Sequence, residues 1–162
     1  EPDAAGDDDP ATWRRHFAVN LEAPVALSRA FAAQAPDGGG ASIVNLLDQK
    51  VLRLDPTHFS YTLSKAALWT ATQTMAQAFA PRVRVNAIAP GPSLPNARQT
   101  EEDFARESAR TPLRRPSDPG EVARAALYLA RAAAVTGTLM PVDSGQHLDW
   151  PDGPWRHGLA NS

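Results

Sequence analysis

Apolar residues recur along this chain first at helical and then at strand-like spacing, and this alternation predicts an α/β fold. Large apolar side chains return every three to four positions over residues 10–34, which is typical of a helix that buries one face. Pro24 lies inside this segment and should kink it, because proline has no backbone N–H and its ring clashes with the preceding turn. We therefore predict one long, kinked helix over 10–34.

Two short segments predict strands, one because it is an apolar run typical of a buried parallel strand and the other because it is rich in β-branched residues. The first is SIVNLL at 42–47, and the second is VRVNAIA at 83–89. Between them, the segment 61–80 has helical spacing and Pro81 ends it. The glycines at 38–40 precede a strand, whereas a phosphate-binding loop follows a strand and opens a helix, so we interpret them as a turn.

The rest of the chain predicts two further helices and a third strand. A polar loop leads to a helix near 101–110. A better marked helix follows Asp118, which stands at the N-cap position, with Glu121 at the capping-box position. The segment 136–145 predicts a strand, and Pro141 within it indicates the edge of the sheet, since proline cannot donate to a strand ladder.

Helix, strand, helix, strand, helix, strand is the order of a doubly wound parallel sheet. The 162 residues fit one domain, in which we expect 1–9 and 147–162 to be irregular. This order by itself predicts an α/β fold class but no particular activity.

Charge and composition favour a small-molecule partner. The net charge of −2 gives no strong field for nucleic acid or an anionic membrane, and no apolar run has the length of a membrane span. The chain has no cysteine, which fits a reducing compartment, so the expected location is the cytoplasm. We expect no metal site, because the four histidines have no ligand partners at suitable spacing. They are His16, His58, His147 and His157.

Tyr61 and Lys65 lie four residues apart on one predicted helix, so their side chains share a face. A lysine ammonium beside a phenol lowers the tyrosine pKa from about 10 and makes it a usable general acid. Lys50 and Lys65 are the lysines of a chain that otherwise uses arginine, which favours a special role for Lys65. Pairs at this spacing also occur by chance on many helices.

Five segments stand in the order and at the spacings of one known family: FAVNLEAP, SIVNLLD, YTLSK, RVRVNAIAPGPS and VTGTLMPVDSG. Over about residues 10–146 the chain thus resembles the short-chain dehydrogenase/reductase family. The resemblance implies an NAD(P)-dependent oxidoreductase and the C-terminal part of a Rossmann-type parallel sheet. The glycine-rich turn that seats the cofactor pyrophosphate is absent, so we expect this chain to lack the N-terminal nucleotide-binding half.

The resemblance also implies roles for individual residues. Asn20 matches the asparagine that holds a proton-relay water, Tyr61 the catalytic acid, and Lys65 the residue that lowers its pKa and binds the nicotinamide ribose. Without the family, Asn20 would be a helix amide satisfied by neighbouring backbone, and the strand-end residues a plain turn. The segment along the nicotinamide and phosphate side of the cofactor contains Pro90, Gly91 and Ser93.

Asp48 departs from the usual pattern, because most family members carry a serine thirteen residues before the tyrosine. An aspartate here resembles the pteridine reductases, which implies hydride transfer from NADPH to the C=N bond of a pterin or dihydrofolate. A carboxyl group can bond the aminopyrimidine edge or relay a proton. It would also raise the pKa of Tyr61 against the effect of Lys65, so that the three titrate together. Alternatively, Asp48 only caps the loop after the strand.

Other functions remain open from the sequence. The substrate could be another carbonyl or imine, NADH could replace NADPH, or the chain could be an inactive fragment that serves as an interaction module. Loss of neighbouring strands would expose an apolar edge at SIVNLL. We expect a homodimer or homotetramer through the helices at 10–34 and 61–80, and a loop at 93–111 that covers the substrate.

Overall fold

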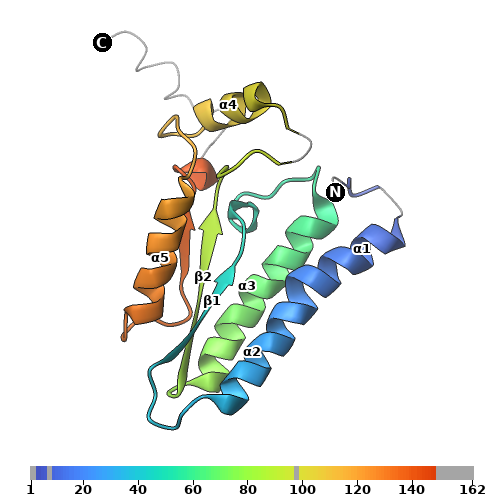
Figure 1. The fold of residues 1–162 in the computed structure, drawn as a ribbon. Helices are drawn as coiled ribbons and strands as arrows, with labels where there is room; N and C mark the ends of the chain where they lie inside the picture. Colours follow the sequence, from blue (N-terminus) through green and yellow to red (C-terminus); the bar gives the residue numbers. More distant parts are fainter. Residues whose placement is uncertain (1–2, 7–8, 97–98, 149–162) are drawn as a thin grey trace.

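The computed structural model describes residues 3–6, 9–96 and 99–148. In this part of the chain, a parallel sheet has helices on both faces, which confirms the predicted α/β class (Figure 1). The strand order is β1-β2-β3, so the central strand is the second along the chain. The strands are β1 (Ala41–Leu46), β2 (Val83–Pro90) and β3 (Leu139–Val142).

The helices form a layer on each side of the sheet, and one helix lies beyond the strand ends. Figure 1 shows α1, α2 and α3 along one face, α5 along the other, and α4 above the carboxyl ends of the strands. Short 3₁₀ helices follow β1 and β3 at Gln49–Val51 and Gln146–Leu148. The α-helices are α1 (Pro10–Phe17), α2 (Ala23–Gln34), α3 (Phe59–Phe79), α4 (Glu101–Ala109) and α5 (Pro119–Arg131).

The core lies around β2, whose residues are buried from both faces. Val85, Ala87 and Ala89 are completely buried, as expected for the central strand of a parallel sheet covered on both faces. Leu68 of α3 closes the core on one side. On the other side, Arg84 donates to the carbonyl oxygens of Leu129 and Ala130, which are left without partners where α5 ends. The site described below therefore rests on a rigid strand.

The segment 10–34 is helical throughout, but a π-turn over Ala18–Glu22 separates α1 from α2. The position of this turn follows from Pro24, because in a regular α-helix the N–H of residue 24 would donate to the carbonyl of residue 20. With that donor missing, the turn widens just before the proline. The predicted kink is therefore present in the form of a π-turn that contains Asn20.

Two predictions near the C-terminal end need correction, and one is confirmed. Asp118 caps α5 by accepting from Gly120 N, but Glu121 makes no capping box, because its carboxylate pairs with Arg115 instead. The third strand occupies Leu139–Val142 rather than the whole of 136–145. Pro141 does lie in an edge strand of the described sheet.

β1 forms the opposite edge of the sheet and leaves an apolar groove open beside it. Leu46 is 56% exposed, and Leu27 on α2 is 72% exposed. Together with Phe31 they line a hollow of about 370 Å³. The apolar edge expected at SIVNLL is thus present. Within the described residues, no helix is both long enough and apolar enough to cross a membrane.

Candidate active site

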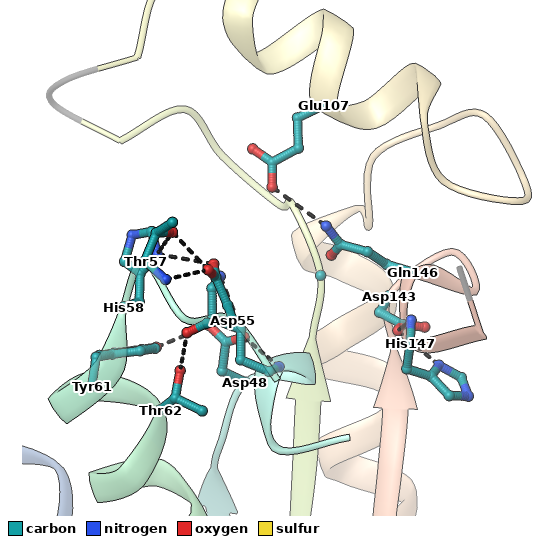
Figure 2. Close-up of polar contacts among 12 residues, drawn as sticks. Asp48, Asp55, Thr57, His58, Tyr61, Thr62, Glu107, Asp143, Gln146 and His147 are labelled. Atoms are coloured by element: carbon teal, nitrogen blue, oxygen red, sulfur yellow. Dashed lines mark hydrogen bonds and ion pairs between the residues drawn. The ribbon is translucent and has the colours of Figure 1, made fainter. Parts of the chain in front are cut away.

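Asp48 lies just past the carboxyl end of β1, where open α/β sheets bind their ligands. Its two oxygens have different partners. Oδ1 accepts from the backbone N–H of Lys50 at 2.8 Å and so caps the 3₁₀ turn, while Oδ2 accepts from Tyr61 Oη at 2.9 Å (Figure 2). The cap and the contact with Tyr61, which the sequence offered as alternatives, are therefore both present in one side chain.

The pKa of Tyr61 is raised above its usual value. Burial is the largest cause, followed by the negative charge of Asp48 and the hydrogen bond to it. The lowering of this pKa by Lys65, which the sequence resemblance implies, does not outweigh these causes. Lys65 Nζ lies 5.9 Å from the centre of the Tyr61 ring and donates to the carbonyl of Leu46 at 2.9 Å. Tyr61 is thus held as a protonated phenol.

Lys65 is itself affected by its surroundings. Burial lowers its pKa, and the charge of Asp48 works in the opposite direction. An ammonium has three N–H donors, of which the Leu46 carbonyl accepts one. Lys65 therefore offers positive charge and hydrogen-bond donors close to the carboxyl end of β1.

Asn20 sits in the π-turn between α1 and α2 and faces α3. Its Nδ2 donates to Ser64 Oγ at 3.0 Å, and Ser64 Oγ donates to the carbonyl of Tyr61 at 2.7 Å. The side chain of Asn20 is therefore paired with a side chain of another helix and not with its neighbouring backbone. This link fixes the π-turn against the helix that carries the tyrosine.

Gly91 follows β2, and its lack of a side chain is explained by the neighbouring strand. A Cβ at this position would lie 2.8 Å from Asp143 Cα, while Gly91 N donates to the Val142 carbonyl at 3.1 Å. Ser93 Oγ in turn donates to the Gly91 carbonyl at 3.1 Å. Packing against the end of β3 thus requires a glycine here, whether or not a ligand approaches.

The predicted residues other than Tyr61 line two hollows. Asp48 lines a pocket of about 150 Å³ together with the strand-end residues Pro90, Gly91 and Ser93. Asn20 and Lys65 line the groove beside β1. Tyr61 joins the two groups, because it bonds Asp48 and lies on the same helix as Lys65.

The sequence predicted a substrate-covering loop at 93–111, but it did not indicate which side chains form the far wall of the smaller pocket. Glu107 of α4 and Gln146, from the turn after β3, face each other there (Figure 2). Gln99, which donates to Glu107, completes the group. These residues come from separate segments, so no local spacing connects them. The contact between α4 and the turn after β3 depends on the tertiary fold alone.

The described histidines have partners close by. His16 Nδ1 lies 2.6 Å from Ser60 Oγ, His58 Nδ1 2.9 Å from Asp55 Oδ2, and His147 Nδ1 2.8 Å from Asp143 Oδ2. No group of three or more His, Cys, Asp or Glu side chains suited to a metal ion occurs in the ranges that the structure describes. His157 and the rest of the predicted irregular tail beyond residue 148 lie outside them.

The donor set around Tyr61 fits a nicotinamide nucleotide. A ribose offers hydroxyls that need both donors and acceptors, and a phenol beside an ammonium supplies them. Tyr61 and Lys65 present these groups near the carboxyl end of β1, and Tyr61 bonds Asp48, which lines the same pocket as Pro90 and Gly91. The residues present are therefore chemically compatible with the cofactor that the sequence resemblance implied.

Comparisons with known proteins agree on one fold. The family described as enoyl-(acyl carrier protein) reductase matches residues 3–147. A FolM alternative dihydrofolate reductase 1 from Brucella canis, solved with NADP, is 48% identical with a TM-score of 0.90, over 94% of this chain and 62% of that one.

Two curated relatives are similar at lower identity than the Brucella canis reductase. Galactitol 2-dehydrogenase (L-tagatose-forming) of Cereibacter sphaeroides is 40% identical over 85% of this chain and 58% of its own length. Dihydromonapterin reductase of Escherichia coli is 34% identical over 80% of this chain and 55% of its own length. The chain thus spans little more than half the length of these relatives.

Proposed function

Since the chain belongs to the short-chain dehydrogenase/reductase family, we propose that the protein carrying it is an NADPH-dependent reductase of the C=N bond of a pterin or dihydrofolate. The 2.9 Å hydrogen bond from Tyr61 Oη to Asp48 Oδ2 carries the proposal, because it sets a proton donor beside a carboxylate suited to an aminopyrimidine. Similarity to the FolM reductase and to dihydromonapterin reductase supports the same substrate class.

Reduction of a C=N bond forms one C–H bond and one N–H bond while the π bond is lost. NADPH, when bound, supplies the hydride. Tyr61 supplies the proton to the ring nitrogen, and its raised pKa keeps the phenol protonated before the step. The ammonium of Lys65 stabilises the negative charge that develops on Oη as the proton leaves.

The remaining residues orient the reactants. Asp48 accepts hydrogen bonds from the amino group of the substrate when Tyr61 turns its hydrogen toward the ring nitrogen. Asn20 fixes the helix that carries Tyr61 through Ser64. By the family resemblance, Asn20 would also hold a water through which a proton returns to Tyr61. Tyr61 and Lys65 would hold the nicotinamide ribose, and the nicotinamide would lie along Pro90, Gly91 and Ser93.

The test uses the protein that includes both this chain and a nucleotide-binding segment. We expect NADPH to bind in a fluorescence titration and to be oxidised in the presence of dihydrobiopterin or dihydrofolate. Asp48→Ser should lower kcat/KM by about a hundredfold or more, because it removes the carboxylate and its bond to Tyr61. NADPH affinity should change little.

Asp37→Ser is the matched control, since Asp37 is an exposed aspartate that pairs with Arg82 far from the pocket. It should leave the kinetics unchanged. Turnover of pterins that survives Asp48→Ser would remove Asp48 from the mechanism. A protein that binds NADPH and ignores both substrates would contradict the proposed substrate class.

A second candidate is a polyol dehydrogenase, favoured by the 40% identity with galactitol 2-dehydrogenase. In that case Asp48 would serve only as the cap of the 3₁₀ turn, a role it fills through Lys50 N. Galactitol with NAD⁺ in the same assay separates the two functions. Absence of any nucleotide binding would instead favour the non-catalytic interaction module.

A further inference from the structure

The pocket that begins at Asp48 contains a second carboxylate at its far wall. Glu107 Oε2 accepts from Gln99 Nε2 at 2.7 Å, and its Oε1 accepts from Gln146 Nε2 at 3.5 Å (Figure 2). Lys50, which lines the same pocket, has its ammonium 3.9 Å from Asp48 Oδ1. Among the described residues, Glu107 accepts from these two amides and makes no ion pair, while Lys50 pairs with Asp48.

Gln49 supplies an independent sign that this pocket takes a ligand with hydrogen-bond donors. Its side chain lines the same pocket and is only 5% exposed, yet Oε1 has no hydrogen-bond partner. A buried acceptor left without a donor costs free energy that a ligand hydroxyl or amino group can recover. The pocket therefore presents acceptors at Asp48, Gln49 and Glu107.

The size of the pocket limits what can reach Glu107. Its volume is about 150 Å³, below the roughly 300–1,000 Å³ that is common for drug-sized ligands. A compact ring at Asp48 would direct a short substituent past Ser93 toward the amides beside Glu107. A long substituent would have to leave the pocket past the carboxylate of Glu107.

We infer that Glu107, held by Gln99 and Gln146, selects reduced pterins with a short, uncharged, hydroxylated side chain over folates, whose side chain ends in glutamate. The inference rests on the proposed function and names the substrate class within it. Hydroxyl groups can donate to Glu107 and accept from the two amides. A glutamate tail instead brings like charge toward Glu107, and like charges at short range disfavour binding.

The experiment compares dihydrobiopterin with dihydrofolate at saturating NADPH in the protein that includes a nucleotide-binding segment. Glu107→Gln keeps the shape and one acceptor oxygen but removes the charge, and it replaces the second acceptor by an amide donor. We expect it to raise kcat/KM for dihydrofolate about five- to tenfold through KM, and to change kcat/KM for dihydrobiopterin less than about threefold. Glu102→Gln is the matched control, because Glu102 lies on the same helix, 83% exposed and paired with Arg106.

A measurement on the unmodified protein tests the inference about Glu107 even if the variant folds poorly. Added salt screens charge repulsion, so the KM for dihydrofolate should fall relative to that for dihydrobiopterin as ionic strength rises. A substrate ratio that is unchanged in Glu107→Gln, or unaffected by salt, would overturn the inference while leaving pterin reduction intact. If neither pterin nor folate is reduced, the proposed function itself fails.

Discussion

The two oxygens of Asp48 accept hydrogen bonds from different donors. A substitution at this residue can therefore be chosen to change one of these interactions and keep the other. Oδ1 caps the turn at Lys50, and Oδ2 accepts the phenol of Tyr61. Asparagine retains an oxygen that can cap the turn, while its neutral amide removes the charge that faces Tyr61. Asp48→Asn is therefore a cleaner probe of the tyrosine than a substitution that loses the turn as well.

In Asp48→Asn we expect Tyr61 to ionise at lower pH than in the wild type. The Asp48 charge and the hydrogen bond to it are two of the three causes that raise the pKa of Tyr61, and burial remains. The measurement is the phenolate absorbance during an alkaline titration. Subtracting the matched Tyr61→Phe variant in each background isolates the signal of this residue.

The upward direction of the Tyr61 pKa shift also determines how the free energy of unfolding depends on pH. An unfolded tyrosine ionises near pH 10, whereas the folded Tyr61 stays protonated, so its contribution is complete below about pH 10 and is lost as the pH rises further. In Asp48→Asn the pKa of folded Tyr61 should lie closer to that of the unfolded chain, so this loss of stability should extend over a smaller pH range. Identical titrations in both backgrounds would show that Asp48 does not act on the tyrosine.

At the scale of elements, α4 carries Glu107 but contributes little to the apolar core, so its N-terminal cap should decide its order. Thr100 Oγ1 accepts from Asp103 N at 3.1 Å, and Asp103 Oδ2 accepts from Thr100 N at 3.1 Å, which completes a capping box. Thr100→Ala should destabilise α4 by about 1 kcal/mol. Faster amide hydrogen exchange over Glu101–Ala109 is the expected result.

Thr70→Ala provides the control for this experiment. Thr70 is exposed on α3, and its hydroxyl only bonds the Ala66 carbonyl within the same helix. It should leave exchange in α4 unchanged. Unaltered protection of α4 in Thr100→Ala would show that tertiary contacts, and not the cap, hold this helix.

The elements that the sequence predicted well are those with strong local signals. β2 is rich in β-branched residues and is largely buried, and α5 starts where Asp118 caps it. The π-turn before Pro24 was anticipated only as a kink, since the missing N–H shows that the hydrogen bonds must change but not how they rearrange. The partner of Glu121 was not predicted, because Arg115 lies before the helix and outside the capping-box pattern.

At the scale of the whole molecule, some residues of the candidate site could be predicted from local spacing and others could not. Tyr61, Lys65 and Asp48 could be predicted because fixed spacings along the chain place them at one end of the sheet. Glu107 and Gln146 could not, because their contact exists only when α4 folds over the strand ends. The rise that Asp48 causes in the pKa of Tyr61 followed from the same spacing, whereas burial, the largest cause, did not.

The open edge of β1 should govern how this chain behaves on its own. Leu46 and Leu27 are largely exposed beside unpaired strand backbone, and such an edge favours association with other chains. We expect the isolated chain to self-associate in size-exclusion chromatography with light scattering. Leu46→Lys should shift it toward smaller species, because an edge lysine opposes strand pairing.

Leu54→Lys is the matched control, since Leu54 is 74% exposed in the loop before α3 and lies outside the groove beside β1. It adds the same charge without touching that edge. Equal dissociation by both variants would assign the effect to net charge, and a monomeric wild-type chain would show that the groove does not drive association. A response confined to Leu46→Lys identifies the β1 edge as the surface that needs a neighbouring strand.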